Sequence, residues 1–213
     1  MSKKGFIIAV FALLGVAQVQ AQVTFKPGIQ IGLNFSKIQN ANLSTKTDFY
    51  LGAFGALKLS KFYTLQPELV YSRQGGKGKV DGFYYEQVSP FEINTVYEER
   101  DADISLQYLS FVTINKFNLY MNFYILVGPC FDILVGNDFK IDENKDFNAN
   151  VSKGEDIDFG IIGGVGFSLP KGISLEARIK KGTRDVFDDN TGSANVNSNL
   201  VYQIGATYIF GLN

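Results

Sequence analysis

The sequence predicts an all-β protein, a closed antiparallel up-and-down transmembrane β-barrel of eight strands. Three observations support this fold class. Apolar residues alternate with polar or small residues at a period of two, and the alternating segments are joined by connections that are short and long in turn. The chain also combines 22 Gly, 19 Phe and 11 Tyr with only 5 Pro. A period of two places successive side chains on opposite faces of a strand.

The first residues predict export. Lys3 and Lys4 precede an apolar run over residues 5–16, and small or medium residues follow at 19–21. This is the pattern of a secretory signal, and the run is too short for an ordinary transmembrane helix. We therefore expect residues 1–21 to be a signal peptide and residues 22–213 to be the barrel domain, the alternative being an uncleaved membrane anchor.

The clearest strand prediction covers residues 119–135. Every odd position from Leu119 to Val135 is apolar, whereas the even positions include Asn122, Gly128 and Asp132. A helix would mix these two sets on its faces, so the pattern favours a strand. Seven further segments alternate similarly, the second and fourth of them less regularly: 27–35, 49–59, 63–71, 104–114, 157–169, 173–180 and 200–210.

The connections between these segments indicate a membrane protein. Three are short, near residues 60–61, 116–118 and 170–172, and four are long and polar: 36–47, 74–102, 136–154 and 181–198. Short and long connections alternate strictly, as they do in barrels with short periplasmic turns and long extracellular loops. We therefore expect the cell outer membrane of a Gram-negative bacterium as the location and its lipid bilayer as the partner of the wall.

The two faces of the strands differ in a way that suits a membrane barrel. The less apolar face carries many glycines and isolated charges, whereas a soluble barrel would present dense Lys, Glu and Thr to water. A narrow eight-stranded lumen is filled by side chains, and charges tolerated there pair with one another. We expect an interior ion cluster with a structural role, in which Glu68 lies within salt-bridge reach of Arg178 or Lys180: Glu68, Glu176, Arg178 and Lys180.

Aromatic residues lie near the ends of the apolar faces, as in the interfacial girdles of membrane barrels. The alternative is that they belong to the core of a soluble β-domain. The residues concerned are Phe35, Tyr63, Tyr71, Phe167, Tyr208 and Phe210.

Several short motifs resemble the PorT-like family of outer-membrane β-barrel proteins. The most specific is the segment LQPELVYS at residues 65–72, and shorter matches are KPGI at 26–29, VGP at 127–129 and EARI at 176–179. The resemblance covers essentially the whole chain after residue 21. It implies the fold and the membrane location, and it implies no activity.

The composition argues against an enzyme. The chain has no His, which excludes Ser-His-Asp and Cys-His catalysis, and its one cysteine, Cys130, allows no intrachain disulfide and no usual zinc site. Residues 75–78 (GGKG) lack the Ser or Thr of a phosphate-binding loop. The net charge of −1 argues against nucleic acid as a partner. We expect no catalytic residue, cofactor or metal.

The long connections are the expected functional surface. Acidic residues in or beside the third connection either form a solvated loop or bind calcium, and their spacing matches no EF-hand: Asp138, Asp142, Glu143, Asp146, Glu155, Asp156 and Asp158. Aromatic residues in the second connection, among them Tyr85 and Tyr97, either extend a hairpin or offer a surface for a ligand. We expect a structural or binding scaffold that recognises a protein or ligand through these loops. The alternatives are a soluble periplasmic ligand-binding barrel and a small pore or secretion-associated component.

Overall fold

The computed structural model describes residues 24–40, 43–141, 148–149, 152–153, 155–188 and 197–211. The expected signal peptide, residues 1–21, lies outside this part of the chain. Among the residues described, no helix combines the length and the apolar character needed to cross a bilayer.

Eight strands form a closed antiparallel ring, so the predicted fold class is confirmed. Each strand pairs with the next along the chain, and the last long strand pairs with the first. Closure leaves no unpaired edge in the wall. The strands of the ring are β1 (Thr24–Ile38), β2 (Leu43–Lys58), β3 (Tyr63–Ser89), β4 (Glu92–Tyr120), β5 (Phe123–Ile141), β8 (Ile157–Ser168), β9 (Ile173–Gly182) and β11 (Asn199–Ile209).

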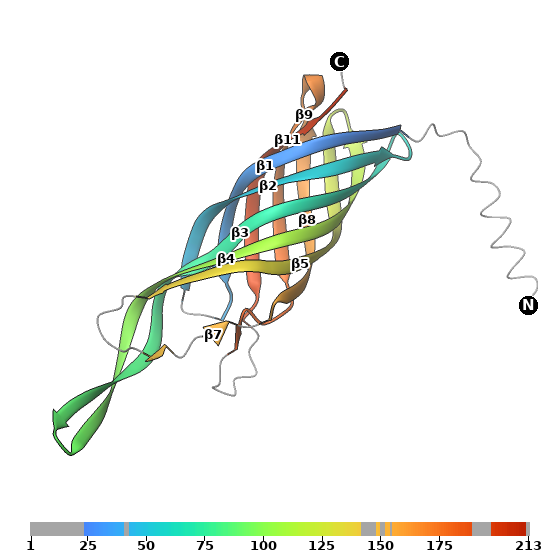
Figure 1. The fold of residues 1–213 in the computed structure, drawn as a ribbon. Helices are drawn as coiled ribbons and strands as arrows, with labels where there is room; N and C mark the ends of the chain where they lie inside the picture. Colours follow the sequence, from blue (N-terminus) through green and yellow to red (C-terminus); the bar gives the residue numbers. More distant parts are fainter. Residues whose placement is uncertain are drawn as a thin grey trace, which may run out of the picture.

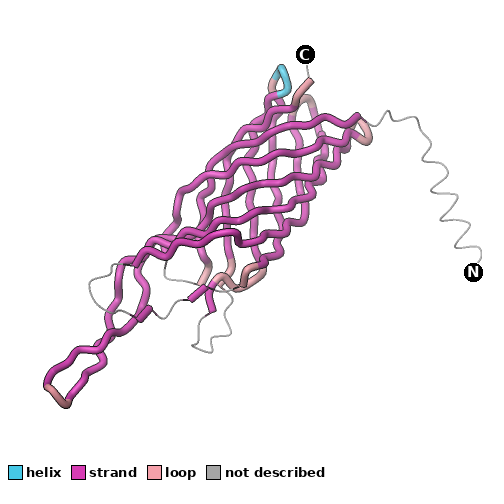
Figure 2. Tube along the Cα trace, in the orientation of Figure 1, coloured by secondary structure: helices cyan, strands magenta, loops and turns pink. Residues whose placement is uncertain are grey.

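The two ends of the barrel differ. The start of β1 and the end of β11 lie at one end, together with the short turns at residues 59–62, 121–122 and 169–172 (Figure 1). The last of these turns contains the 3₁₀ segment η1 (Pro170–Gly172), which is the only helical colour in Figure 2. At the other end the β3–β4 hairpin continues far beyond the wall (Figure 1). Short turns identify the first end as periplasmic and the hairpin end as extracellular.

Three short strands lie outside the ring at the extracellular end. Strand β6 (Asn148–Ala149) pairs with Gly82 and Phe83 of β3. Strands β7 (Ser152–Lys153) and β10 (Phe187–Asp188) pair with each other in a separate small sheet.

The outer wall is apolar and the lumen is polar. Ile31 is 62% exposed on the outside, whereas its neighbour Gln30 is 3% exposed on the inside. This arrangement is the reverse of a soluble barrel and matches a wall surrounded by lipid. Exposed outer residues include Ile29, Leu33, Leu51, Leu69, Phe111, Val127, Ile161, Leu175 and Ile204; buried inner residues include Asn34, Gln66, Ser72, Asp132 and Gln203.

Aromatic pairs mark both rims of the apolar wall. At the periplasmic end the ring centroids of Tyr63 and Phe117 are 5.4 Å apart and those of Tyr208 and Phe210 are 5.2 Å apart; towards the extracellular end those of Phe49 and Tyr71 are 6.2 Å apart.

The prediction of a turn at residues 116–118 is wrong. Strand β4 continues to Tyr120, the turn occupies residues 121–122, and β5 begins at Phe123. Leu119 therefore belongs to β4, and Met121 lies in the turn with a positive φ of 51°. The apolar alternation continues in phase across this two-residue turn, so periodicity alone does not reveal where the chain reverses.

The first two long loops are also largely strand. β1 and β2 extend through most of residues 36–47, and residues 74–89 and 92–102 are a paired hairpin that belongs to β3 and β4. Beyond the membrane both faces of a strand meet water or polar neighbours. The two-residue alternation fades there, although the backbone remains paired.

Glycines inside the barrel face large aromatic side chains. A Cβ added at Gly166 would lie 2.3 Å from the ring of Tyr124, and one added at Gly205 would lie 2.2 Å from the hydroxyl of Tyr50. Tyr50 and Tyr124 are each 1% exposed. The narrow lumen is thus filled by aromatic rings of one strand that pack on glycine backbone of another strand.

Candidate functional site

The interior ion cluster is built on two strands. Arg178 of β9 donates two hydrogen bonds to the carboxylate of Glu68 on β3, with N–O distances of 2.8 and 2.9 Å. Its Nε also donates to Oε2 of Glu176, at 2.7 Å. All three side chains are buried, and bidentate pairing satisfies the planar guanidinium fork.

Further polar groups complete the coordination of both carboxylates. Glu68 accepts hydrogen bonds from Gln30 at 2.9 Å and from Gln66 at 2.8 Å. Glu176 accepts one from the hydroxyl of Tyr124 at 2.6 Å and one from Lys116 at 3.2 Å. The ammonium of Lys116 also lies 4.3 Å from the centre of the Tyr124 ring, within cation–π range.

Lys180 belongs to a different pair. Its ammonium forms an ion pair with Asp132 of β5 and donates to Ser110 at 3.2 Å. The structure therefore brings Glu68, Glu176 and Arg178 together and places Lys180 beside Asp132 instead. Asp132 was visible as a lone charge in the alternation of residues 119–135. Lys116 was not predicted to join the interior ion cluster, because the sequence pattern assigns residues 116–118 to a short connection and not to a strand.

The charges of the ion cluster balance once Lys116 is included. Two carboxylates, Glu68 and Glu176, face two cations, Arg178 and Lys116. A residual cavity of only about 10 Å³ remains beside Glu68 and Arg178, which is at the lower limit for one water molecule. Both carboxylates are engaged by several donors, so the arrangement braces the lumen and leaves little room for a reactant.

An apolar cluster closes the lumen above this layer, towards the extracellular end. Its members come from β1 to β4 and from the segment after β9, and each is buried: Ile38, Leu43, Val80, Ala102, Ile104, Leu106, Tyr108 and Val186.

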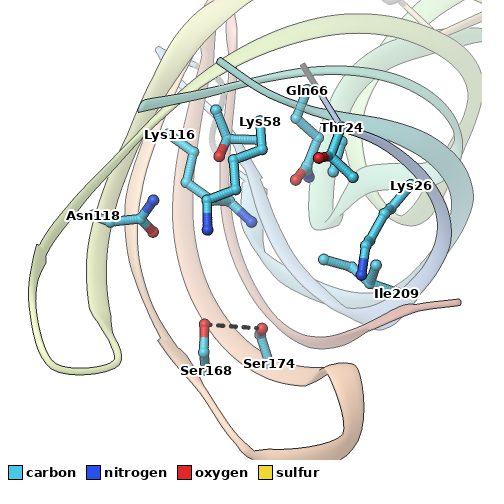
Figure 3. A pocket seen from close by; sticks show the side chains of 11 residues that line it. Thr24, Lys26, Lys58, Gln66, Lys116, Asn118, Ser168, Ser174 and Ile209 are labelled. Carbon is cyan, nitrogen blue, oxygen red and sulfur yellow. Dashed lines mark hydrogen bonds between the residues drawn. The ribbon is translucent and has the colours of Figure 1, made fainter. Parts of the chain in front are cut away.

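The periplasmic end of the lumen is open. A pocket of about 350 Å³ lies there, below the ion cluster, and three lysine side chains line it: Lys26, Lys58 and Lys116 (Figure 3). Gln66 forms part of its deep side, and Ser168 and Ser174 lie on its rim, joined by a hydrogen bond of 3.4 Å.

The hairpin ribbon, residues 79–101, projects beyond the wall at the extracellular end (Figure 1). The β3–β4 register runs without a shift from Tyr63–Phe117 to Gln87–Ile93. β2 leaves β3 at Gly78 and β5 leaves β4 at Ala102. Beyond that level, the strand pairing that the structure describes for the ribbon is with β6, at Gly82 and Phe83.

One face of the ribbon is aromatic and apolar. The cross-strand pairs Phe83–Tyr97, Tyr85–Thr95 and Gln87–Ile93 place their side chains on this face. The Phe83 ring lies 5.6 Å from that of Tyr85 and 6.1 Å from that of Tyr97. At the tip, Phe91 is fully exposed.

Those acidic residues of the third connection that the structure describes do not converge. Asp142, Glu143 and Asp146 lie outside the described residues. Asp138 pairs with Lys140 at 3.4 Å. Asp158 faces inward and accepts from the backbone N–H groups of Thr183 and Arg184, at 3.0 and 2.9 Å. In the part of the chain that can be described, no three His, Cys, Asp or Glu side chains gather in a way that could hold a metal ion.

Comparison with known proteins identifies a family. A family model described as outer membrane protein beta-barrel domain matches residues 16–188. A search of curated protein sequences finds no match.

Solved structures with a similar course of the chain are small outer-membrane proteins. Neisserial surface protein A is 12% identical, with 86% of this chain and 96% of that chain covered and a TM-score of 0.48. Ail of Yersinia pestis is 13% identical (87% and 97% covered, TM-score 0.46), and OprG of Pseudomonas aeruginosa is also 13% identical (87% and 94% covered, TM-score 0.39).

Proposed function

Because this chain belongs to the outer membrane protein β-barrel domain family and resides in the outer membrane, we propose that its wall is a scaffold and that the hairpin ribbon is its binding surface for another protein. The observation that carries the proposal is the paired ribbon with an aromatic face outside the membrane. Loops and hairpins held by a rigid scaffold are common sites of recognition.

The aromatic face supplies the anchors. Tyr85 and Tyr97 are 63% and 78% exposed, and Phe91 and Ile93 extend the same surface to the tip. Tyrosine contributes a large contact area with few rotatable bonds, which makes it frequent among the residues that dominate binding energies. A surface of this kind favours a protein partner with an apolar patch.

The charge of the ribbon narrows the class of partner. Residues 79–101 contain six acidic and two basic residues. Complementary charge across an interface raises the association rate and disfavours partners of like sign. We therefore propose a partner whose apolar patch is surrounded by Lys and Arg.

The remaining interior features have structural roles in this proposal. The ion cluster of Glu68, Glu176 and Arg178, with the neighbouring Lys180–Asp132 pair, fills and braces the lumen. The segment at residues 65–72 supports assigning the chain to the PorT-like branch of the family, and we carry no secretion activity over from that branch.

The test compares two tyrosines at opposite ends of the molecule. Tyr97 on the ribbon is 78% exposed and Tyr120 at the periplasmic end is 77% exposed, so they are a matched pair. A photo-cross-linking residue is placed at either position in cells, and the adducts formed in the intact outer membrane are identified. We expect a distinct protein adduct from position 97 that position 120 does not give.

Binding to the purified adduct partner is then measured. The Tyr85→Ser/Tyr97→Ser variant should bind at least about tenfold more weakly than the parent chain, whereas Tyr120→Ser should bind as the parent does. Raised salt should slow association. Equal binding by all three proteins, or the same adducts from both positions, would contradict the proposal.

We also propose that residues 1–21 are removed on export. The intact mass of the protein purified from the outer membrane should correspond to a chain that begins at Gln22. A mass that includes residues 1–21 would favour a retained anchor.

A further inference from the structure

The charges of the barrel are strongly asymmetric. None of the 21 Asp and Glu residues lies in the segments that build the periplasmic end, whereas five lysines do: Lys26, Lys58, Lys61, Lys116 and Lys171. The segments are residues 24–28, 56–64, 115–125, 166–174 and 207–211. Among the described residues of this end, Glu176 offsets the charge of Lys116, and no Asp or Glu of the segments themselves offsets the charge of the other lysines, so the periplasmic mouth carries a positive potential.

Three of these lysines converge on one cavity. Lys26 of β1, Lys58 of β2 and Lys116 of β4 line the pocket of about 350 Å³ and direct their side chains into the mouth of the lumen (Figure 3). Lys61 and Lys171 lie in the turns of the same rim and do not line the pocket. Three lysines of this end therefore share the pocket, and the other two lie outside it.

Two of the three converging charges are uncompensated. Lys116 is paired with Glu176 and belongs to the neutral ion cluster above the pocket, so this cluster supplies no negative charge for Lys26 or Lys58. Among the residues that the structure describes, the ammonium group of Lys26 donates only to the backbone carbonyl of Gly211, at 3.1 Å. Within the same described residues, the ammonium group of Lys58 makes no ion pair or hydrogen bond.

Neutral polar groups complete the lining. Thr64 and Ser174 contribute hydroxyl groups. Gln66 is fully buried, and its amide nitrogen donates to Glu68 at 2.8 Å, which joins the deep side of the pocket to the ion cluster.

We propose that this pocket binds a phosphate group presented from the periplasmic side. Lysine binds phosphate as a point charge and needs no planar partner, and the residues that line the pocket include no arginine fork. The two uncompensated ammonium groups of Lys26 and Lys58 match a phosphate anion. The chemistry is shared by soluble phosphate esters and by the headgroups of phospholipids in the inner leaflet.

The test is calorimetric titration of the full chain in a nonionic, phosphate-free detergent at low salt. The two probes are inorganic phosphate and detergent-dissolved phosphatidylglycerol. The double variant Lys26→Gln/Lys58→Gln should bind the preferred probe at least about tenfold more weakly than the parent, since each lysine removed deletes a hydrogen bond to a charged group. Lys58→Arg keeps the charge and should retain binding.

The matched control is Lys61→Gln/Lys171→Gln, which removes the same charge from the same rim outside the pocket and should bind as the parent does. Tighter binding of inorganic phosphate identifies a soluble phosphate as the source, and tighter binding of phosphatidylglycerol identifies a lipid headgroup. The proposal is overturned if neither probe binds the parent, or if both double variants weaken binding equally. Heat-dependent mobility on a denaturing gel verifies that each variant is folded.

Discussion

Glu68 and Arg178 form a bidentate ion pair across the lumen, although 110 positions separate them in the chain. Three strands lie between β3 and β9 in either direction round the ring. The pair therefore joins opposite walls, and with Glu176 and Lys116 it acts as a brace through the centre of the barrel.

Removal of the Arg178 guanidinium should lower the free energy of unfolding. Among the described residues, Arg178→Met leaves Glu68 buried without an ion-pair partner and Glu176 with Lys116 alone. Breaking a buried ion pair typically costs about 3–5 kcal/mol. We expect a lower free energy of unfolding by about this amount in urea titrations of the barrel refolded into detergent.

Arg184→Met is the control for the arginine substitution, because Arg184 is exposed at the extracellular end. It should change the unfolding free energy by less than about 0.5 kcal/mol. Similar losses for the two variants would show that the central pair is not a brace.

A pair of glycines tests how closely the wall is packed. A Cβ at Gly128 would lie 1.9 Å from the backbone carbonyl oxygen of Thr113, whereas a Cβ at Gly163 meets nothing nearer than 3.9 Å. Gly128→Ala should therefore lower the unfolding free energy by about 1–3 kcal/mol, and Gly163→Ala should leave it nearly unchanged. Equal urea midpoints for the two variants would contradict this reading of the lumen.

Stability at acidic pH should depend on Asp103, which lies at the extracellular end outside the apolar wall. Partial burial opposes its ionisation, but hydrogen bonds and charge from Lys46 and Lys77 prevail and hold its pKa below the ordinary value. Its stabilising contribution is therefore present above the unfolded-state pKa of about 3.9 and is lost as the pH falls through the lower folded-state value.

Asp103→Asn should accordingly be less stable than the parent chain at pH 7, and the difference should shrink as the pH falls below about 4. Asp101→Asn, an exposed neighbour, is the control. Urea midpoints measured from pH 7 to pH 3 check the trend, and a gap between parent and Asp103→Asn that stays constant would refute it.

The filled lumen predicts that the barrel does not conduct. The ion cluster leaves about 10 Å³ beside it, and the apolar cluster closes the space towards the extracellular end. The purified protein should give no steady current in planar bilayers under conditions in which a porin conducts. Reproducible single-channel steps would contradict this prediction and would support the alternative that the protein is a small pore.

Much of the fold was predictable because the membrane imposes a local pattern. Residues such as Ile29 and Ile31 must face lipid while Gln30 and Gly32 face the lumen, and this alternation is written in consecutive positions. Outside the membrane the two faces of a strand no longer differ in this way, so the alternation no longer marks the strands. The turn at residues 121–122 preserves the alternation, so it was misplaced at residues 116–118. The ribbon at residues 79–101 lies outside lipid, so the sequence left an extended hairpin as one of two alternatives for the second connection.

Local sequence by itself determined the strand class and the inward-facing positions of the charges Glu68, Glu176, Arg178 and Lys180, because each depends on the environment of one residue and its immediate neighbours. The membrane barrel was predicted from the order of short and long connections along the whole sequence. Only the tertiary structure decided which charges meet. Arg178 pairs with Glu68 and Lys180 with Asp132 because of the stagger of strands round the ring, and Lys26 and Lys58 share a pocket because strand ends converge at the mouth. Such meetings join positions far apart in the chain, and a two-residue period carries no information about them.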